Sequence, residues 1–264
     1  MKKTICIILA LIMCVALFAC GEKKEKADGD LGYILDNGKL VIGITEYEPM
    51  NYYDASGKLV GFDTEFAEAL CAKLGVKPEF VVINWDTKEF ELSSKSIDCI
   101  WNGLTVSEER KENMAFTASY LENQQVLVVK ADQADNFKTT ADFAGLSLAA
   151  EEGSAGETSI LQDIPDATYV PVGAQTDALL EVKAGTSDGC VLDITLAQAM
   201  TGEGTDYADL KMLPISLTNE EYAIGLRLES NAVAKFDEII KELISDGTID
   251  KLAEKYELTD LLIK

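Results

Sequence analysis

The sequence predicts an α/β fold built as two similar lobes. Short apolar runs typical of buried strands alternate with segments whose apolar residues recur at helical spacing. Two segments also resemble each other, because Ser96–Ile100 and Ser187–Val191 each place a polar turn and an Asp before a short strand pattern. About 230 residues follow the N-terminal apolar segment, enough for one large or two small domains. We therefore expect two lobes that each contribute half of a binding site.

In the first half of the chain, capping residues and glycines separate the expected elements. Asp63 begins a helix that places Phe66, Leu70 and Leu74 on one face, and Gly75 ends it. The other elements expected here are a helix over 88–94 and strands over 40–44, 79–83, 97–101 and 125–129.

The second half repeats this alternation. Gly153–Gly156 opens a helix, and Asn231 precedes another, which has apolar residues at helical spacing and ends at Gly247. The other elements expected here are strands over 146–150, 189–192 and 221–226, and helices over 174–182 and 249–256.

The N-terminus predicts export. A basic start precedes an apolar run over residues 5–19, which is too short for a comfortable membrane span and typical of a signal peptide. The run ends Leu17-Phe18-Ala19-Cys20-Gly21, which resembles a bacterial lipobox. This resemblance implies that residues 1–19 are removed and that Cys20 carries lipid; the alternative is an ordinary signal peptide with an incidental Cys. Residues 20–34 are then the lipidated Cys and a flexible tether, since residues 21–30 lack apolar periodicity.

Composition excludes several classes of function. The chain has 23 basic and 46 acidic residues, and its net charge of −23 argues against nucleic acid and anionic lipid as partners. Histidine is absent, which removes Ser-His and Cys-His nucleophiles and His-based metal sites. We expect a monomer with no metal and no cofactor. Beyond Cys20, Cys71, Cys99 and Cys190 lie in helix and strand patterns and are expected to be small buried residues, with one internal disulfide as the alternative.

The segment after the strand over 97–101 carries the groups that a zwitterionic amino acid requires. It presents the backbone carbonyl of Gly103, the hydroxyl of Thr105 and the guanidinium of Arg110 within eight residues. A carbonyl accepts from an ammonium, and the planar guanidinium binds a carboxylate with two parallel hydrogen bonds. The alternative is a solvated surface Arg, because charged residues surround Arg110 on both sides.

Several signatures, in order, resemble the polar amino acid family of bacterial solute-binding proteins, the receptors of ABC importers. These are Tyr47–Met50, Gly57–Asp63, Trp85-Asp86, Gly103–Thr105 with Arg110, and Asp246–Leu252. The resemblance implies the type II periplasmic binding protein fold, with two Rossmann-like lobes joined by a two-strand hinge. Lobe 1 would comprise residues 35–123 and 220–264, and lobe 2 residues 124–219. The chain would cross the hinge near 122–125 and 216–220.

The same resemblance implies roles for the site residues. Arg110 would pair with the ligand α-carboxylate, joined from lobe 2 by Ser154 and the backbone of Ala155 at a helix N-terminus. Asp193 would anchor the α-ammonium. Ser154 and Asp193 can alternatively be plain helix N-caps.

The ligand side chain would be bound by a second group of residues. Tyr47 and Trp85 would pack aromatic rings on it. Asn102 and Glu151 would contact it, with Lys88 and Glu46 as neighbours; Lys88 could offset the preference of Glu151 for a basic or amide side chain. Trp101 is expected in the core, because it points away from Asn102 along a strand.

These features predict an extracytoplasmic receptor, lipid-anchored at the cell membrane. It would capture a polar L-amino acid such as glutamine or arginine and deliver it to an ABC permease. An alternative is an enzyme on the same fold, resembling cyclohexadienyl dehydratase, for which Glu151 is the candidate general acid. A third reading is a detached sensor subunit for a membrane partner.

Overall fold

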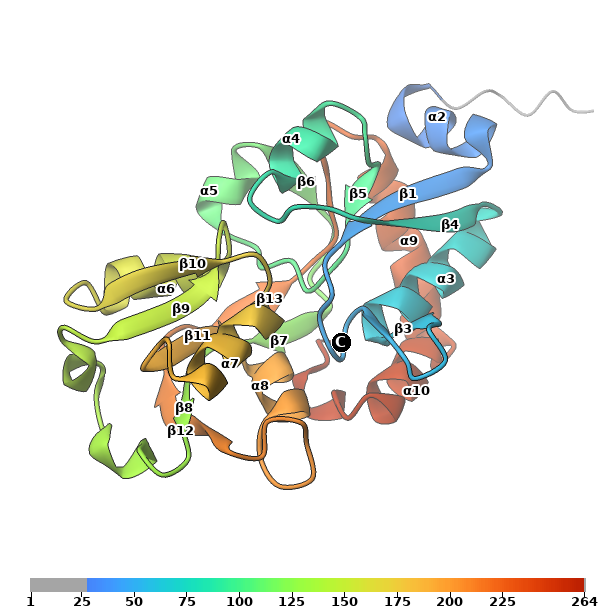
Figure 1. Cartoon of the computed structure of the whole chain (residues 1–264). Coiled ribbons are helices and arrows are strands. Elements are labelled where there is room, and N and C mark those ends of the chain that lie inside the picture. Colours follow the sequence, from blue (N-terminus) through green and yellow to red (C-terminus); the bar gives the residue numbers. More distant parts are fainter. Residues whose placement is uncertain (1–27, 264) are drawn as a thin grey trace, which may run out of the picture.

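The computed structural model describes residues 28–263, which form two α/β lobes side by side (Figure 1). The predicted signal peptide, Cys20 and the tether up to residue 27 lie outside the described residues. Helix α2 (Gly29–Asn37) begins within the predicted tether over 20–34, so that prediction is wrong for residues 29–34. The helix is docked rather than free, because Asp30 forms an ion pair with Arg227 (Oδ2 to Nε 2.9 Å) and Ile34 is buried.

Lobe 1 is a five-stranded sheet with helices packed on it. The strand order is β4 (Lys77–Val82), β1 (Lys39–Ile44), β5 (Cys99–Ile100), β14 (Gly225–Arg227) and β6 (Met114–Phe116). Its helices are α3 (Phe62–Leu74), α4 (Lys88–Ser93), α5 (Glu108–Lys111), α9 (Ala232–Ser245) and α10 (Thr248–Lys255), and a hairpin of β2 (Tyr52–Tyr53) and β3 (Leu59–Val60) lies beside them. Helix α9 buries Phe236, Ile240 and Leu243 along one face, as their spacing predicts, and contacts α3.

Lobe 2 repeats the plan of lobe 1. The strand order is β10 (Thr168–Val172), β9 (Ser147–Glu151), β11 (Gly189–Asp193), β8 (Gln125–Lys130) and β12 (Leu210–Ser216), with helices α6 (Ala155–Asp163), α7 (Gln175–Ala184) and α8 (Ile194–Met200). In each sheet the first three strands are parallel and the fourth runs antiparallel to both of its neighbours. The two similar sequence segments lead into β5 and β11, the third strand of each sheet. The repeat in the sequence is therefore a repeat of structure.

A two-stranded antiparallel sheet joins the lobes. It pairs β7 (Leu121–Asn123) with β13 (Glu220–Tyr222), so that Asn123 lies opposite Glu220. The single strand predicted over 221–226 is wrong, because the chain leaves β13 at Tyr222 and enters the lobe 1 sheet as β14 at Gly225. Two Rossmann-like lobes with a two-strand hinge confirm the predicted fold class.

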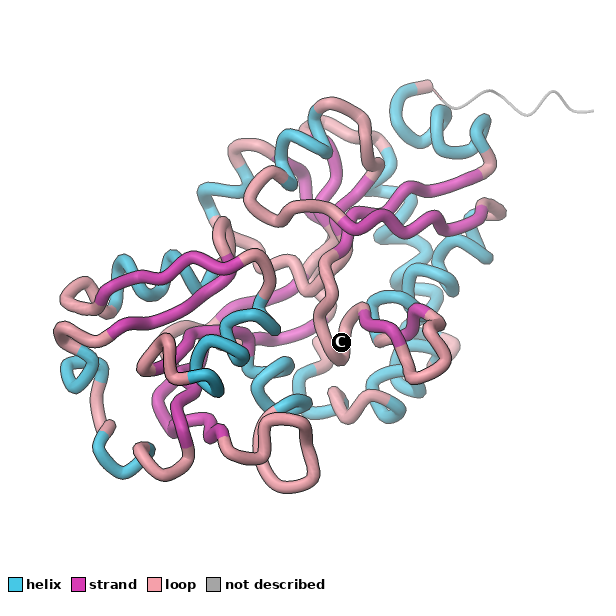
Figure 2. Tube along the Cα trace, viewed as in Figure 1, coloured by secondary structure: helices cyan, strands magenta, loops and turns pink. Residues whose placement is uncertain are grey.

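The carboxyl ends of β1 and β9 point toward the space between the lobes, and loops from both lobes meet there (Figure 2). Ligands of α/β sheets bind at such strand ends. The core lies within each lobe, and Trp101 packs against Phe66 with ring centroids 4.9 Å apart, which confirms its predicted place in the core. Cys71, Cys99 and Cys190 are buried and free. Within residues 28–263, no helix has the length and apolar character needed to cross a membrane.

Candidate functional site

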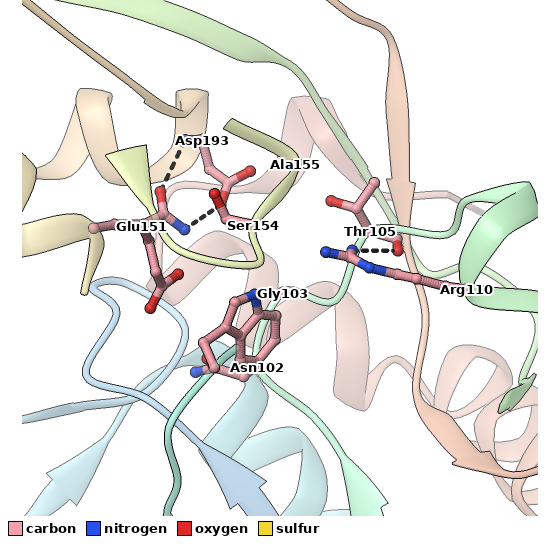
Figure 3. Close-up of a pocket in the computed structure, with 10 residues that line it drawn as sticks. Asn102, Gly103, Thr105, Arg110, Glu151, Ser154, Ala155 and Asp193 are labelled. Atoms are coloured by element: carbon pink, nitrogen blue, oxygen red, sulfur yellow. Dashed lines mark hydrogen bonds between the residues drawn. The ribbon is translucent and has the colours of Figure 1, made fainter. Parts of the chain in front are cut away.

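A small cavity lies between the two lobes and is lined by residues from both. The lining comprises Trp85, Asn102, Gly103, Thr105, Arg110, Glu151, Ser154, Ala155, Gln175 and Asp193 (Figure 3). Of the ten predicted binding residues, only Tyr47 is absent from this set. The structure therefore brings together residues that are far apart in the sequence.

Arg110 is the third residue of the short helix α5 (Glu108–Lys111). Its backbone N–H donates to Ser107 Oγ, the helix cap (3.2 Å), which turns the side chain inward. The guanidinium is buried, and it donates from Nη1 to the carbonyl of Thr105 (2.8 Å) and from Nη2 to the carbonyl of Gly153 in lobe 2 (3.2 Å). Within residues 28–263 no carboxylate forms an ion pair with it. A buried cation held only by carbonyls can take a ligand carboxylate as its counter-ion.

Burial lowers the pKa of Arg110, and the nearby Glu220 and Asp193 carboxylates oppose that effect. Arg110 therefore remains charged. The alternative of a solvated surface Arg is wrong, because only 8% of the residue is exposed.

Gly103 needs its glycine, since its φ of 56° lies in the left-handed region and a Cβ would lie 2.6 Å from Tyr47 Cε1. The buried Asp63 carboxylate holds this turn by accepting from the Gly103 N–H (2.7 Å) and the Tyr120 hydroxyl (3.0 Å). Burial raises the pKa of Asp63 to about 7. Asp63 thus positions the loop that carries Gly103 and Thr105.

Asp193 ends β11 in lobe 2 and precedes α8. Its carboxylate accepts from three side-chain amides: Asn123 Nδ2 (2.5 Å), Gln125 Nε2 (2.6 Å) and Gln175 Nε2 (2.5 Å). It makes no cap bond to α8, so the plain N-cap alternative does not describe it. Burial, and then the neighbouring Glu220, raise the pKa of Asp193 to about 6. A ligand ammonium would give this carboxylate the cation that it lacks.

The hinge contributes a second carboxylate to the same network. Glu220 Oε2 accepts from Thr105 Oγ1 (3.0 Å), Asn123 Nδ2 (2.9 Å) and Gln125 Nε2 (3.0 Å). Glu220, Asn123, Gln125 and Gln175 are not predicted as site residues from the sequence. The available signal in the sequence was that polar residues occur at strand ends and at the predicted hinge crossings, where the surrounding framework is apolar.

Helix α6 directs its N-terminus at the cavity. Ser154 is its N-cap, and Ser154 Oγ accepts from the Glu157 N–H (3.2 Å). Ala155, the first residue of the helix, has no intrahelical acceptor for its N–H. The capping role and an anion-binding role coexist here, because capping by Ser154 leaves the first-turn N–H of Ala155 available.

Two predicted contacts with the ligand side chain differ from expectation. Asn102 lines the cavity, but its amide group is fully occupied by Thr45 and Asn51 (2.7 to 3.0 Å). It therefore fixes the loop after β1 and offers the ligand only apolar contact. Tyr47 lies beside the cavity, where its hydroxyl bonds to Thr195 Oγ1 (2.5 Å) in lobe 2 and to Tyr222 (2.6 Å).

Of the remaining residues predicted near the ligand side chain, some line the cavity and others do not. Trp85 and Glu151 line the cavity and are buried. Lys88 is buried, and its Nζ donates to the carbonyls of Trp85 (3.1 Å) and Gly153 (2.8 Å). Glu46 is exposed and is not part of the lining. Within residues 28–263, no cluster of three or more His, Cys, Asp or Glu side chains has the geometry of a metal site.

Comparisons with known proteins find similarity along most of the chain. The family described as bacterial extracellular solute-binding proteins, family 3, matches residues 40–259. The L-cystine-binding protein TcyJ of Escherichia coli (strain K12) is 28% identical over 248 residues, covering 93% of this chain and 92% of that protein.

Two solved structures are similar along most of the chain. One is an ABC uptake transporter substrate binding protein from Streptococcus pneumoniae with bound histidine (TM-score 0.81, 29% identity, 89% of this chain and 99% of that chain). Another is the ancestral amino acid-binding protein AncCDT-1, a precursor of cyclohexadienyl dehydratase (TM-score 0.78, 29% identity, 86% of this chain and 98% of that chain).

Proposed function

The chain belongs to the bacterial extracellular solute-binding proteins of family 3, and on that basis we propose that it captures a polar L-amino acid between its lobes and delivers it to an ABC import permease. One observation carries the proposal for this site: a buried guanidinium in lobe 1 and a buried carboxylate in lobe 2 line one cavity, and neither has an ionic partner among the described residues.

The zwitterion would join these two charges. Its carboxylate would bind Arg110 through the planar fork and would also accept from Ser154 and the Ala155 N–H at the start of α6. Its ammonium would bind Asp193, with the Gly103 carbonyl and the Thr105 hydroxyl as further partners. Because these groups come from both lobes, the ligand favours the state in which the lobes are closed.

Lobe closure is supported by direct contacts across the cleft. Arg110 and Lys88 of lobe 1 both donate to the Gly153 carbonyl of lobe 2, and Tyr47 bonds to Thr195. The small cavity and these bonds indicate that the lobes must separate before a ligand enters. Rotation about β7 and β13 would provide that movement.

The relatives compared here carry the names of binding proteins, including the ancestral protein related to a dehydratase. The chain is accordingly a binding protein and not an enzyme. Turnover of prephenate or arogenate by the purified protein would contradict this conclusion.

Isothermal titration with the twenty L-amino acids and their D-enantiomers tests the proposed function. We expect at least one L-amino acid to bind more tightly than about 100 μM, or about −5.5 kcal/mol. If no L-amino acid reaches that affinity, the receptor function is wrong. If the D-enantiomers bind equally well, the joint use of Arg110 and Asp193 is wrong.

We further propose that the signal peptide over 1–19 is removed, that Cys20 carries lipid, and that the receptor acts as a monomer tethered at the outer face of the cell membrane. The support is the lipobox-like sequence Leu17–Gly21 and the family's extracellular location. Fractionation of cells expressing the chain and its Cys20→Ala variant tests the anchor. Retention of the variant in the membrane fraction would contradict it.

A further inference from the structure

Glu151 is the ionisable residue of the cavity lining that the zwitterion does not use. Glu151 ends strand β9 and is 3% exposed, and its Oε1 has no hydrogen-bond partner among residues 28–263. Leaving a buried carboxylate oxygen unpaired is costly, so native proteins rarely keep one without a use. Because Glu151 lines the cavity, a ligand atom can be its partner.

The cations nearest to Glu151 are engaged elsewhere. Lys88 Nζ donates to the Trp85 and Gly153 carbonyls, and the Arg110 guanidinium donates to the Thr105 and Gly153 carbonyls. Neither forms an ion pair with Glu151 within the described part of the chain. Lys88 therefore contacts both lobes, and neither cation satisfies Glu151 directly.

The mouth of the cleft also favours a positive ligand. The groove that leads into it is lined by Lys88 and Arg110 but by a larger number of acidic residues: Asp86, Glu89, Glu108, Glu109, Glu157, Asp163 and Glu220. With the chain's net charge of −23, this lining attracts cations and repels anions. Inside, the Trp85 ring forms part of the wall and offers an apolar surface to the stem of a long side chain.

Resting on the proposed function, we propose that the ligand is an L-amino acid with a cationic side chain, and that Glu151 is the residue that selects it. The α-carboxylate and α-ammonium occupy Arg110 and Asp193, and the side-chain cation pairs with Glu151. A neutral amide can form one hydrogen bond with Glu151 but supplies no counter-charge for its ionised form, and an acidic side chain disfavours that form.

The protonation of Glu151 agrees with this role. Burial, and then Asp193 on β11, raise its pKa to about 8; Lys88 on α4 and Arg110 on α5 oppose the rise, and Asp177 on α7 adds to it. Near pH 7 the empty cavity therefore holds mostly the neutral carboxyl. Binding of a cation ionises it and releases a proton, whereas binding of a neutral analogue does not.

L-Arginine and L-citrulline form the test pair, because they have the same length and differ by one charge. Titration calorimetry near pH 7, in two buffers of different ionisation enthalpy, measures both affinity and proton release. We expect arginine or lysine to bind more tightly than citrulline, glutamine, cystine and glutamate, and to release a proton. In Glu151→Gln, arginine should lose about 10- to 100-fold in affinity, while citrulline changes by less than about threefold.

Glu152→Gln is the matched control, because Glu152 is the exposed neighbour of Glu151 and should leave every affinity unchanged. The inference is overturned, with the receptor function intact, if a neutral or acidic amino acid binds more tightly than both arginine and lysine. It is also overturned if Glu151→Gln weakens arginine and citrulline equally. If no amino acid binds, the proposed function itself fails. If Glu151→Gln does not fold, the affinities of the wild-type protein for cationic, neutral and acidic amino acids still test whether the ligand is cationic.

Discussion

Replacing Arg110 with Ala should weaken binding of the cognate amino acid by roughly 30- to 1000-fold. The guanidinium is buried between the lobes and donates from Nη1 and Nη2 to backbone carbonyls. A ligand carboxylate would form two parallel, charge-assisted hydrogen bonds with such a fork. Alanine removes both of them and leaves the carboxylate of the bound ligand without a cation.

The magnitude follows from the bonds gained and lost. Two hydrogen bonds to a charged group contribute about 3–6 kcal/mol together. Ligand binding also weakens the existing bonds to the Thr105 and Gly153 carbonyls, which offsets part of this gain. A net loss of about 2–4 kcal/mol gives the predicted range of affinities. Arg110→Lys keeps the charge but not the fork, so its loss should be intermediate.

Titration calorimetry with the amino acid found to bind measures the effect, and thermal unfolding of the ligand-free variant shows that it is folded. Lys111→Ala is the control, because Lys111 is the exposed next residue on α5 and, within residues 28–263, forms an ion pair with Glu108 alone (2.7 Å). The assignment of Arg110 as the carboxylate site is refuted if Arg110→Ala, while folded, binds the ligand within about threefold of the wild type.

Three further outcomes are expected. Gly103→Ala should lower the free energy of unfolding by about 2–3 kcal/mol in urea titrations, since it adds a clash with Tyr47 to the strain of a positive φ. Gly38→Ala is the control, because Gly38 has a φ of 64° but nothing within 4 Å of an added Cβ, and it should lower the free energy of unfolding by about 1 kcal/mol. Equal losses in the two variants would contradict the predicted clash with Tyr47. Asp193→Asn should weaken amino acid binding by about 10- to 100-fold at pH 7, as measured by titration calorimetry. An unchanged affinity would show that Asp193 does not bind the ligand ammonium. The folded-state pKa of Glu151, about 8, lies above its ordinary 4.5, so this group's contribution to stability is full below pH 4.5 and is lost as pH rises through 8. Urea midpoints of ligand-free Glu151→Gln should therefore fall less than those of the wild type between pH 5 and 8, and parallel pH profiles would show that the pKa of Glu151 is not raised.

Local sequence patterns were sufficient to predict a structural feature wherever the residues that form it are neighbours in the chain. Gly103, Thr105 and Arg110 lie within eight residues on the loop after β5 and the short helix α5, so their spacing indicated a zwitterion site. Helical periodicity likewise located α3 and α9, because each buries one face against its sheet. The N-terminal boundary was misjudged, since the start of α2 is polar and is held by the long-range ion pair of Asp30 with Arg227.

These local patterns could not predict hydrogen bonds between residues that are far apart in the sequence. Glu220 bonds to Thr105 across 115 positions, and Gln125 reaches Asp193 across 68. No spacing rule links such residues, because the hinge pairs β13 with β7 and the lobe 2 sheet pairs β8 with β11. Asn102 shows the opposite error: its residue type suggested a ligand contact, yet Thr45 and Asn51 occupy its amide completely.

The sequence by itself determined the class of ligand, because a guanidinium, a carboxylate and a helix N-terminus can recognise an amino acid backbone wherever the fold places them. Only the tertiary structure decided which polar groups remain free to read the side chain. Lys88 and Glu151 are both ionisable residues, and the sequence does not show which of them is free. In the closed lobes Lys88 donates to two carbonyls, whereas Glu151 Oε1 has no partner in the described part of the chain. The physical reason is that a buried polar atom without a partner in the protein can bind a ligand without giving up an existing hydrogen bond, and whether it has a partner depends on contacts between distant segments.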